Sequence, residues 1–168
     1  MIRKLRPEDA AELAAMVDEL SVHEGDEPGR FTPAKALADA IAPGAPLSAA
    51  VAEADGAIVG YVFWHFGYES AWAARGSFVA DLYVRASHRG GGVGDALLRA
   101  AAKATAAAGG PFLWWTAYRS NERARRFYRN RAFEEDRVVA YAAAHEKFEA
   151  LLDSDRGAGP FQDADATE

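Results

Sequence analysis

The sequence predicts an α/β fold with a mixed sheet, in which helices and strands alternate after an initial β-hairpin. Two strand-like segments, residues 47–54 and 57–66, flank an Asp55-Gly56 pair that is a strong hairpin-turn signal. Amphipathic helix patterns precede and follow this hairpin. The chain has 168 residues, 50% apolar and 26% charged, which is enough for one domain with a full core.

Two helices are predicted before the hairpin. The first begins at Pro7, because proline lacks an N–H and the acids Glu8 and Asp9 suit the positive end of the helix dipole. The second begins at Thr32-Pro33. Apolar residues recur at helical spacing in both, at Leu13, Met16, Val17 and Leu20 in the first and at Leu37 and Ile41 in the second.

The elements after the hairpin follow from turn signals and periodicity. They are a loop at 67–76, a strand at 77–84, a glycine cluster at 89–94, a helix at 95–108 with Ala96, Leu97, Ala100 and Ala104 facing inward, a strand at 112–117, a helix at 121–130 and a strand at 138–142. We expect a single domain over residues 1–152 and an acidic, disordered tail over residues 153–168.

Composition excludes several classes of protein. The absence of cysteine removes disulfide scaffolds, thiolate zinc sites and cysteine nucleophiles, and the scattered histidines show no metal-ligand spacing. No apolar run reaches 18 residues and no signal-peptide core is present, so we expect a cytoplasmic protein without membrane association. A net charge of −6, from 19 basic and 25 acidic residues, disfavours nucleic-acid binding.

The glycine cluster predicts an anion site. A strand, the loop Arg89-Gly-Gly-Gly-Val-Gly94 and then a helix would present free backbone amides at the positive end of a helix dipole. A P-loop is excluded, because Asp95 stands where Lys-Ser or Lys-Thr is needed. A dinucleotide fold is disfavoured by the missing third glycine of its fingerprint. A glycine-rich turn without a ligand is the alternative.

A second signal lies downstream, where segment 121–133 reads Asn-x-x-Ala-x-x-Phe-Tyr-x-x-x-Ala-Phe. With Leu-Tyr-Val at 82–84 and the loop at 89–94, in this order and spacing, the chain resembles the GNAT N-acetyltransferase superfamily over residues 1–152. The resemblance implies a central mixed, mostly antiparallel sheet flanked by helices, acetyl-CoA as co-substrate, no metal, and a homodimer.

Within that superfamily the chain is most similar to the spermidine/spermine and thialysine N-acetyltransferases. Trp72, Gly76 and the run Asp81-Leu-Tyr-Val84 resemble their motifs, as does an acidic segment at 18–27 that holds five acids and no Lys or Arg. Ala80 stands where that subfamily has a glutamate, Asp136 where it has a tryptophan, and Ala132 where glycine is usual.

The resemblance implies a role for each motif residue. Tyr128 would protonate the departing thiolate, and Asp81 is the candidate base, provided that a β-bulge brings its side chain to the site. Alternatively, the acids at 24–27 would accept the proton through water. The donor would contact Leu82, Tyr83, Val84, Arg89, Gly90, Gly91, Gly92, Val93, Gly94, Asn121 and Phe127. The acceptor amine would contact Glu24, Asp26, Glu27 and Trp72.

The expected function is acetyl transfer from acetyl-CoA to a primary amine of a small, cationic acceptor such as a polyamine, a diamine or thialysine, by direct attack in a ternary complex. Two alternatives remain: an acetyltransferase for a protein, peptide or aminoglycoside amine, and a non-catalytic acyl-CoA-binding protein, which Ala80 makes conceivable. Asn121 could equally cap its helix, and Tyr128 could be a packing residue.

Overall fold

A computed structural model describes residues 1–153 and divides the chain into two compact units, Met1–Tyr118 and a second that begins at Arg119. The tail predicted at 153–168 lies, apart from Asp153, outside the described residues. The single domain expected over residues 1–152 stays a prediction.

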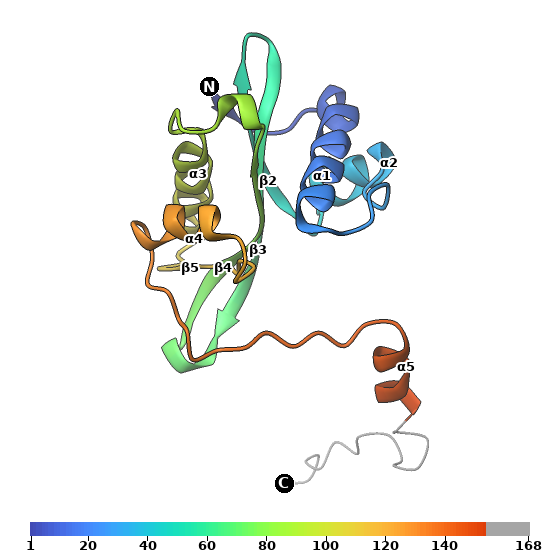
Figure 1. Cartoon of the computed structure of the whole chain (residues 1–168), viewed down its shortest axis with the longest axis vertical. Coiled ribbons are helices and arrows are strands. Elements are labelled where there is room, and N and C mark those ends of the chain that lie inside the picture. Colours follow the sequence, from blue (N-terminus) through green and yellow to red (C-terminus); the bar gives the residue numbers. More distant parts are fainter. Residues whose placement is uncertain (154–168) are drawn as a thin grey trace, which may run out of the picture. The chain divides into compact units, whose positions relative to one another are not determined.

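The first unit is built on a five-stranded sheet (Figure 1). Its strands stand in chain order: β1 (Ile2–Arg3), β2 (Ser48–Ala54), β3 (Ala57–Glu69), β4 (Ala74–Val84) and β5 (Leu113–Trp114). Neighbouring strands are antiparallel except β4 and β5, which are parallel. The predicted mixed, mostly antiparallel sheet is therefore confirmed.

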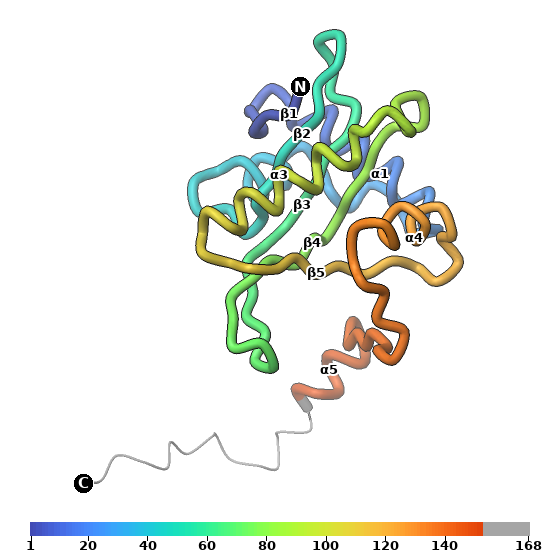
Figure 2. Tube along the Cα trace, turned by 90° about the vertical axis from the view of Figure 1, so that its left-hand side faces the viewer, coloured from blue at the N-terminus to red at the C-terminus, as the bar shows by residue number. Residues whose placement is uncertain are grey.

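Helices cover both faces of this sheet. α1 (Ala10–Glu24) and the short α2 (Pro33–Ala36) lie on one face, and α3 (Val93–Ala107) crosses β2, β3 and β4 on the other (Figure 1; Figure 2). On the α1 side, Leu13 and Met16 are fully buried against Val51, Tyr61 and Phe63. The helical spacing of the sequence thus identifies the buried face of α1 correctly.

Local sequence sets where these elements begin and end. Gly25 ends α1 with a φ of 86°, the left-handed conformation that glycine adopts most easily. The Thr32 hydroxyl caps α2, and Asp55 and Gly56 form the predicted hairpin turn, both with positive φ. The remaining short turns are 3-10 helices at Pro7–Asp9, Ser70–Trp72 and Ala86–His88 and a π-helical turn at Leu37–Ile41.

The β3–β4 hairpin is longer than predicted. Residues 67–76 were expected to form a loop, yet Gly67 pairs with Gly76 inside the ladder and only 70–73 make the turn. A Cβ at Gly76 would lie 2.3 Å from the Phe112 ring, so this glycine serves a close approach between β4 and the segment before β5.

Two other strand predictions were wrong. The strand expected at 112–117 is limited to Leu113–Trp114, and residues 138–142 form no strand in the described part of the chain. Strand-like composition at 138–142 is not sufficient, because a strand needs a neighbour for its backbone groups.

The buried faces of two helices are rotated from the prediction. α3 buries Leu97, Leu98, Ala101 and Thr105. Thr105 can lie on the buried face because its hydroxyl forms hydrogen bonds with the Ser77 hydroxyl at 2.7 Å and with the Ala101 carbonyl at 2.9 Å. After α2 the π-helical turn leaves Leu37 exposed, while Ala36 is buried.

The second unit contains two short helices, α4 (Glu122–Arg129) and α5 (Glu146–Asp153). α4 matches the helix predicted at 121–130. The Asn121 Oδ1 accepts the Ala124 amide at 3.0 Å, so Asn121 is its N-cap.

Gly60 provides a test of the packing between β3, β4 and α3. A Cβ at Gly60 would lie 2.7 Å from the Tyr83 carbonyl oxygen and 3.2 Å from a Leu97 methyl group. Since the backbone within a sheet cannot move aside, Gly60→Ala should lower the free energy of unfolding by roughly 1–3 kcal/mol in urea titrations. The matched control is Gly67→Ala on the same strand, where no atom lies within 4 Å. Equal stability of the two variants would contradict this packing.

Candidate active site

An irregularity in β4 decides where its acidic side chain points. Asp81 pairs with Phe63 and Val79 with Trp64, so Ala80 is an extra residue in the ladder. Side chains of a regular strand alternate, and residues 77, 79 and 81 would then share one face. Ser77 contacts Thr105 of α3, whereas Asp81 contacts Tyr61 in the core beneath α1. The bulge at Ala80 therefore turns Asp81 to the α1 face.

Asp81 is half-buried and makes one strong polar contact. The Tyr61 hydroxyl donates to its Oδ2 at 3.1 Å. Burial raises the pKa of the Asp81 carboxyl, and the hydrogen bond from Tyr61 works against that rise. A carboxylate whose pKa is raised takes up a proton more readily, as a general base requires.

Glu24, at the C-terminal end of α1, interacts electrostatically with Asp81. Although the residue is exposed, the protein atoms around its carboxylate partly desolvate it, which raises the pKa of Glu24. The negative charges of Asp81 and Asp26 raise it further. The structure thus brings together three of the predicted site residues, from β4, α1 and the turn after α1, in a region of uncompensated negative charge.

The other acids of segment 18–27 are already engaged. Their partners are the Gly29 amide for Asp18 at 2.6 Å, the Arg85 guanidinium for Glu19 at 2.9 Å, and Arg30 for Glu27 at 3.1 Å. Sequence alone suggested five unpaired acids. Of the five acids in this segment, which lies wholly within the described residues, only Glu24 and Asp26 lack such a hydrogen-bond donor or cation.

Beyond its first residues, β4 has no second neighbour within the first unit. β5 pairs only with Ser77 and Phe78. An exposed strand edge of this kind presents unpaired N–H and C=O groups that an extended ligand can bind.

Leu82 and Val84 direct their backbone groups toward that edge. The Arg85 amide donates to the Val59 carbonyl on β3 at 2.9 Å, and bonding in an antiparallel ladder repeats every second residue. The backbone N–H and C=O of Tyr83 therefore point toward β3, like the amide of Arg85, and the backbone groups of Leu82 and Val84 point away from β3. This is the orientation that backbone pairing with an extended ligand at this edge requires.

Arg89 links the end of β4 to the glycine loop. Its Nε donates to the Val84 carbonyl at 2.6 Å, and its guanidinium lies 5.5 Å from the centre of the Tyr83 ring. Its amide donates to the Ala86 carbonyl at 3.3 Å. Arg89 thus holds the loop beside the open strand edge rather than offering a free amide.

The rest of the loop has the features of an anion site. Gly90 and Gly92 have φ values of 86° and 81°, and an added Cβ at either would meet nothing within 4 Å. The first hydrogen bond of α3 runs from the Ala96 amide to the Gly92 carbonyl, so the amides of Val93 and Gly94 have no acceptor within the helix. Backbone donors, open space and the positive end of a 15-residue helix suit a phosphate.

Trp72 lies apart from the acids. It belongs to the turn of the β3–β4 hairpin, is 61% exposed, and meets the Phe112 ring edge-on at 4.7 Å. Because Ala80 is unpaired, Asp81 lies six ladder positions beyond Ala74, a distance of about 20 Å along the strand. Within one chain, Trp72 is thus not brought to the carboxylates.

The remaining predicted residues belong to the second unit. Tyr128 is half-buried on α4, its ring 5.2 Å from that of Phe127. The Arg131 guanidinium lies over the Phe127 ring, 3.9 Å from its centre. Asn121, as described, caps the helix.

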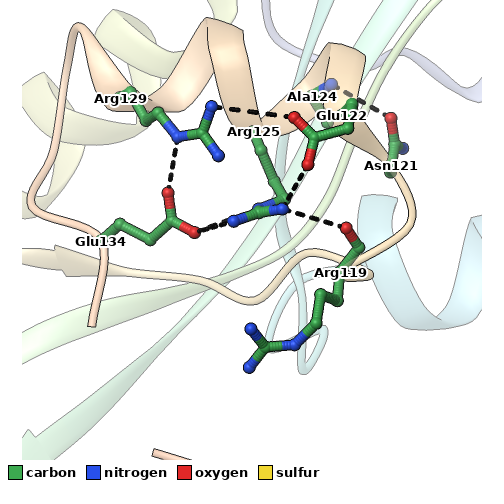
Figure 3. A network of polar contacts seen from close by, with 7 residues as sticks. All are labelled: Arg119, Asn121, Glu122, Ala124, Arg125, Arg129 and Glu134. Atoms are coloured by element: carbon green, nitrogen blue, oxygen red, sulfur yellow. Dashed lines mark hydrogen bonds and ion pairs between the residues drawn. The ribbon is translucent and has the colours of Figure 1, made fainter. Parts of the chain in front are cut away.

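Two arginines of α4 are held by carboxylates (Figure 3). Glu134 accepts from the Nε of Arg125 at 3.0 Å and from the Nε of Arg129 at 2.7 Å. Glu122 contacts both arginines as well. The sequence indicated an arginine-rich helix, but not that these two cations are neutralised locally.

Sequence reasoning missed Tyr61. No motif marks it, and its hydroxyl meets a residue 20 positions away on the neighbouring strand. From the sequence, only the alternation of side chains along β3 could have placed Tyr61 on the face that α1 covers.

An open strand edge, backbone amides at the start of a helix and a partly desolvated carboxylate suit an enzyme that binds a phosphate-bearing donor beside a basic group. The sequence matches the model of the acetyltransferase (GNAT) family over residues 14–133, and the chain belongs to this family. It is therefore an N-acetyltransferase, and acetyl-CoA is the acetyl donor that this family uses.

Solved structures share this fold. An integron cassette protein from the mobile metagenome of V. cholerae is 18% identical, with a TM-score of 0.75 over 90% of this chain and 96% of that one. A ribosomal-protein-alanine N-acetyltransferase from Brucella melitensis is 25% identical, with a TM-score of 0.70 over 86% and 98%. An aminoglycoside acetyltransferase from a soil metagenome is 17% identical, with a TM-score of 0.72 over 87% and 96%. No curated protein matches the sequence.

No helix within residues 1–153 is long and apolar enough to cross a membrane. In the same part of the chain, no three His, Asp or Glu side chains are grouped so that they could hold a metal ion.

Gly92 tests the anion site. Gly92→Val would place a branched side chain in the open space over the loop, and acetyl-CoA affinity measured by calorimetry should fall by at least roughly tenfold, since steric exclusion removes several backbone hydrogen bonds. Gly56→Val is the matched control, because Gly56 has a φ of 78° and equally open surroundings at the β2–β3 turn. Both variants carry the same kind of backbone strain. Equal affinities in folded protein would remove the loop from the donor site.

Proposed function

We propose that this acetyltransferase transfers the acetyl group of acetyl-CoA to a primary amine of a small, cationic acceptor of the polyamine, diamine or thialysine type. The observation that supports the acceptor class is the position of Asp81, which the bulge at Ala80 places in electrostatic contact with Glu24. A cation would relieve the repulsion between these carboxylates, whereas a neutral acceptor would not.

The chemistry requires a base. An alkylammonium has a pKa near 10.4, so freeing its lone pair at pH 7 costs about 4–5 kcal/mol. In our proposal Asp81 accepts that proton, and the amine nitrogen then attacks the thioester carbonyl. The carbon–sulfur bond breaks, and the departing thiolate takes a proton from Tyr128, as the family resemblance implies. The new amide nitrogen loses its extra proton to water, and the Tyr128 phenolate is reprotonated from solvent.

The donor is held by backbone groups. Amides of residues 90–94 would bind the pyrophosphate, while Leu82 and Val84 would pair with the pantetheine arm along the open edge of β4. The family resemblance implies donor contacts for Phe127 and Asn121 as well. The residues present therefore fit acetyl-CoA.

The names of two structural neighbours suggest other acceptors, a ribosomal protein N-terminus and an aminoglycoside. A thiol-release assay separates these possibilities with a diamine, a polyamine, thialysine, an aminoglycoside and an alanyl peptide. Turnover with the peptide alone, or with no amine at all, would contradict the proposal.

Glu24 should determine affinity for the acceptor. In Glu24→Gln the apparent KM for a diamine should rise roughly fivefold and depend less on ionic strength, because one of the attractive charges is removed. Glu27→Gln should have a smaller effect, since Arg30 already neutralises that carboxylate. Glu8→Gln, on the exposed first turn of the chain, makes the same change in net charge and is the control. A KM that is unchanged in Glu24→Gln would show that this carboxylate is ordinary surface.

Asp81→Asn tests the base. It keeps an oxygen for the Tyr61 hydroxyl but cannot take a proton, so turnover with a high-pKa amine should fall roughly 10²–10⁴-fold. Thialysine, with a lower-pKa amine, should lose less, and acetyl-CoA affinity should not change. Equal losses for both amines would leave Asp81 a binding role only, and no loss for either would remove it from the site.

A further inference from the structure

Tyr61 is a buried residue to which the proposed function gives no role in binding the donor, in binding the acceptor or in protonating the leaving group. Its side chain is fully buried in the middle of β3, and its ring is packed against Phe63 at 4.8 Å and Tyr83 at 6.2 Å between centroids. Neighbours on both sides fix the ring, so its hydroxyl occupies a fixed point at the edge of the core.

That hydroxyl is directed at one oxygen of the candidate base. It donates to Oδ2 of Asp81 at 3.1 Å, and no further hydrogen bond to this carboxylate is made by residues 1–153. Asp81 directly follows the bulge, where the regular ladder no longer fixes side-chain direction. A fixed donor at this point selects one orientation of the carboxyl group and leaves Oδ1 without a donor.

Tyr61 remains a donor at every working pH. Burial and the negative charges of Asp81 and Glu24 raise the pKa of its phenol far above the usual value. The group cannot serve as a base itself, and its effect must pass through Asp81.

We propose that Tyr61 is the positioning residue of the reaction: its buried hydroxyl holds Oδ2 of Asp81, so that Oδ1 receives the proton of the acceptor ammonium. This inference rests on the proposed function for the identity of the proton donor. The hydrogen bond also stabilises the charged carboxylate, so it sets the lower end of the pH range in which Asp81 is ionised.

Other groups face Asp81 and must be held constant in any test. Glu24 on α1 interacts electrostatically with Asp81, and Asp26 interacts in turn with Glu24. Tyr83 on β4 directs its hydroxyl to Glu19 at 2.9 Å, and Glu19 is neutralised by Arg85. None of these groups is altered by a change at position 61.

The first test is Tyr61→Phe, which removes the hydroxyl and keeps the ring. Loss of the donor raises the pKa of Asp81 further, so the acidic limb of the kcat/KM profile should move to higher pH. At neutral pH, kcat should fall by roughly 10- to 100-fold through misorientation, while the KM for acetyl-CoA is unchanged. Tyr68→Phe is the control, because Tyr68 lies on the same strand with its side chain 66% exposed.

A double-mutant cycle separates positioning from general damage. If Tyr61 acts through Asp81, Tyr61→Phe should have no further effect on kcat in an Asp81→Asn background. Additive losses would overturn the inference. If Tyr61→Phe does not fold, 3-fluorotyrosine at position 61 gives an almost isosteric alternative. Its more acidic phenol is a stronger donor, and the acidic limb should then move to lower pH.

A titration without substrate distinguishes this inference from the proposed function. The carboxyl carbon of Asp81, labelled with ¹³C and assigned by its loss in Asp81→Asn, is followed by NMR against pH in wild type and Tyr61→Phe. A higher midpoint in the variant supports the contact even if no amine is acetylated, in which case only the proposed function fails. Identical midpoints and identical pH profiles in an active enzyme would overturn the role of Tyr61 and leave the function standing.

Discussion

The extra residue in β4 is the constraint on which the candidate site depends. A regular strand would direct Asp81 to the α3 side, where Ser77 and Thr105 close the core with a hydroxyl pair. With Ala80 outside the ladder, the same strand serves both layers: Ser77 faces α3, and Asp81 and Tyr83 face α1. One inserted residue thus changes which helix layer the acidic side chain meets, without changing the order of the strands.

The bulge also explains how a carboxylate can be available although the resembled subfamily carries its glutamate one position earlier. Ala80 is exposed and offers no functional group. In our proposal the backbone irregularity transfers the acidic function to the next residue, where a buried tyrosine and a neighbouring glutamate provide its surroundings. Both influences on Asp81 come from residues remote in sequence, Tyr61 on β3 and Glu24 on α1. Burying part of such a charge costs stability, a cost that enzymes commonly accept at their active sites.

Features governed by local rules could be predicted from the sequence. The Asp55-Gly56 turn, the capped start of α2, the buried side of α1 and the glycine loop before α3 all depend on a few adjacent residues. Long-range pairing was not predictable in the same way. The partners of Glu19 and Asp81 are 66 and 20 residues away, and no spacing rule connects them. Residues 138–142 illustrate the opposite error: their composition favours a strand, but pairing is a property of two segments.

α4 differs from the sheet in what holds it together. It has only eight residues, none of them buried, and a helix of this length is marginal by itself. Its arginines are instead tied to Glu122 and Glu134 by exposed ion pairs, each worth at most about 1 kcal/mol. The helix that carries Tyr128 is thus secured by contacts that dissolved ions weaken, whereas the sheet that carries Asp81 is secured by apolar burial that they do not weaken. The two halves of the proposed proton transfer therefore differ in their sensitivity to the ionic composition of the surrounding solution.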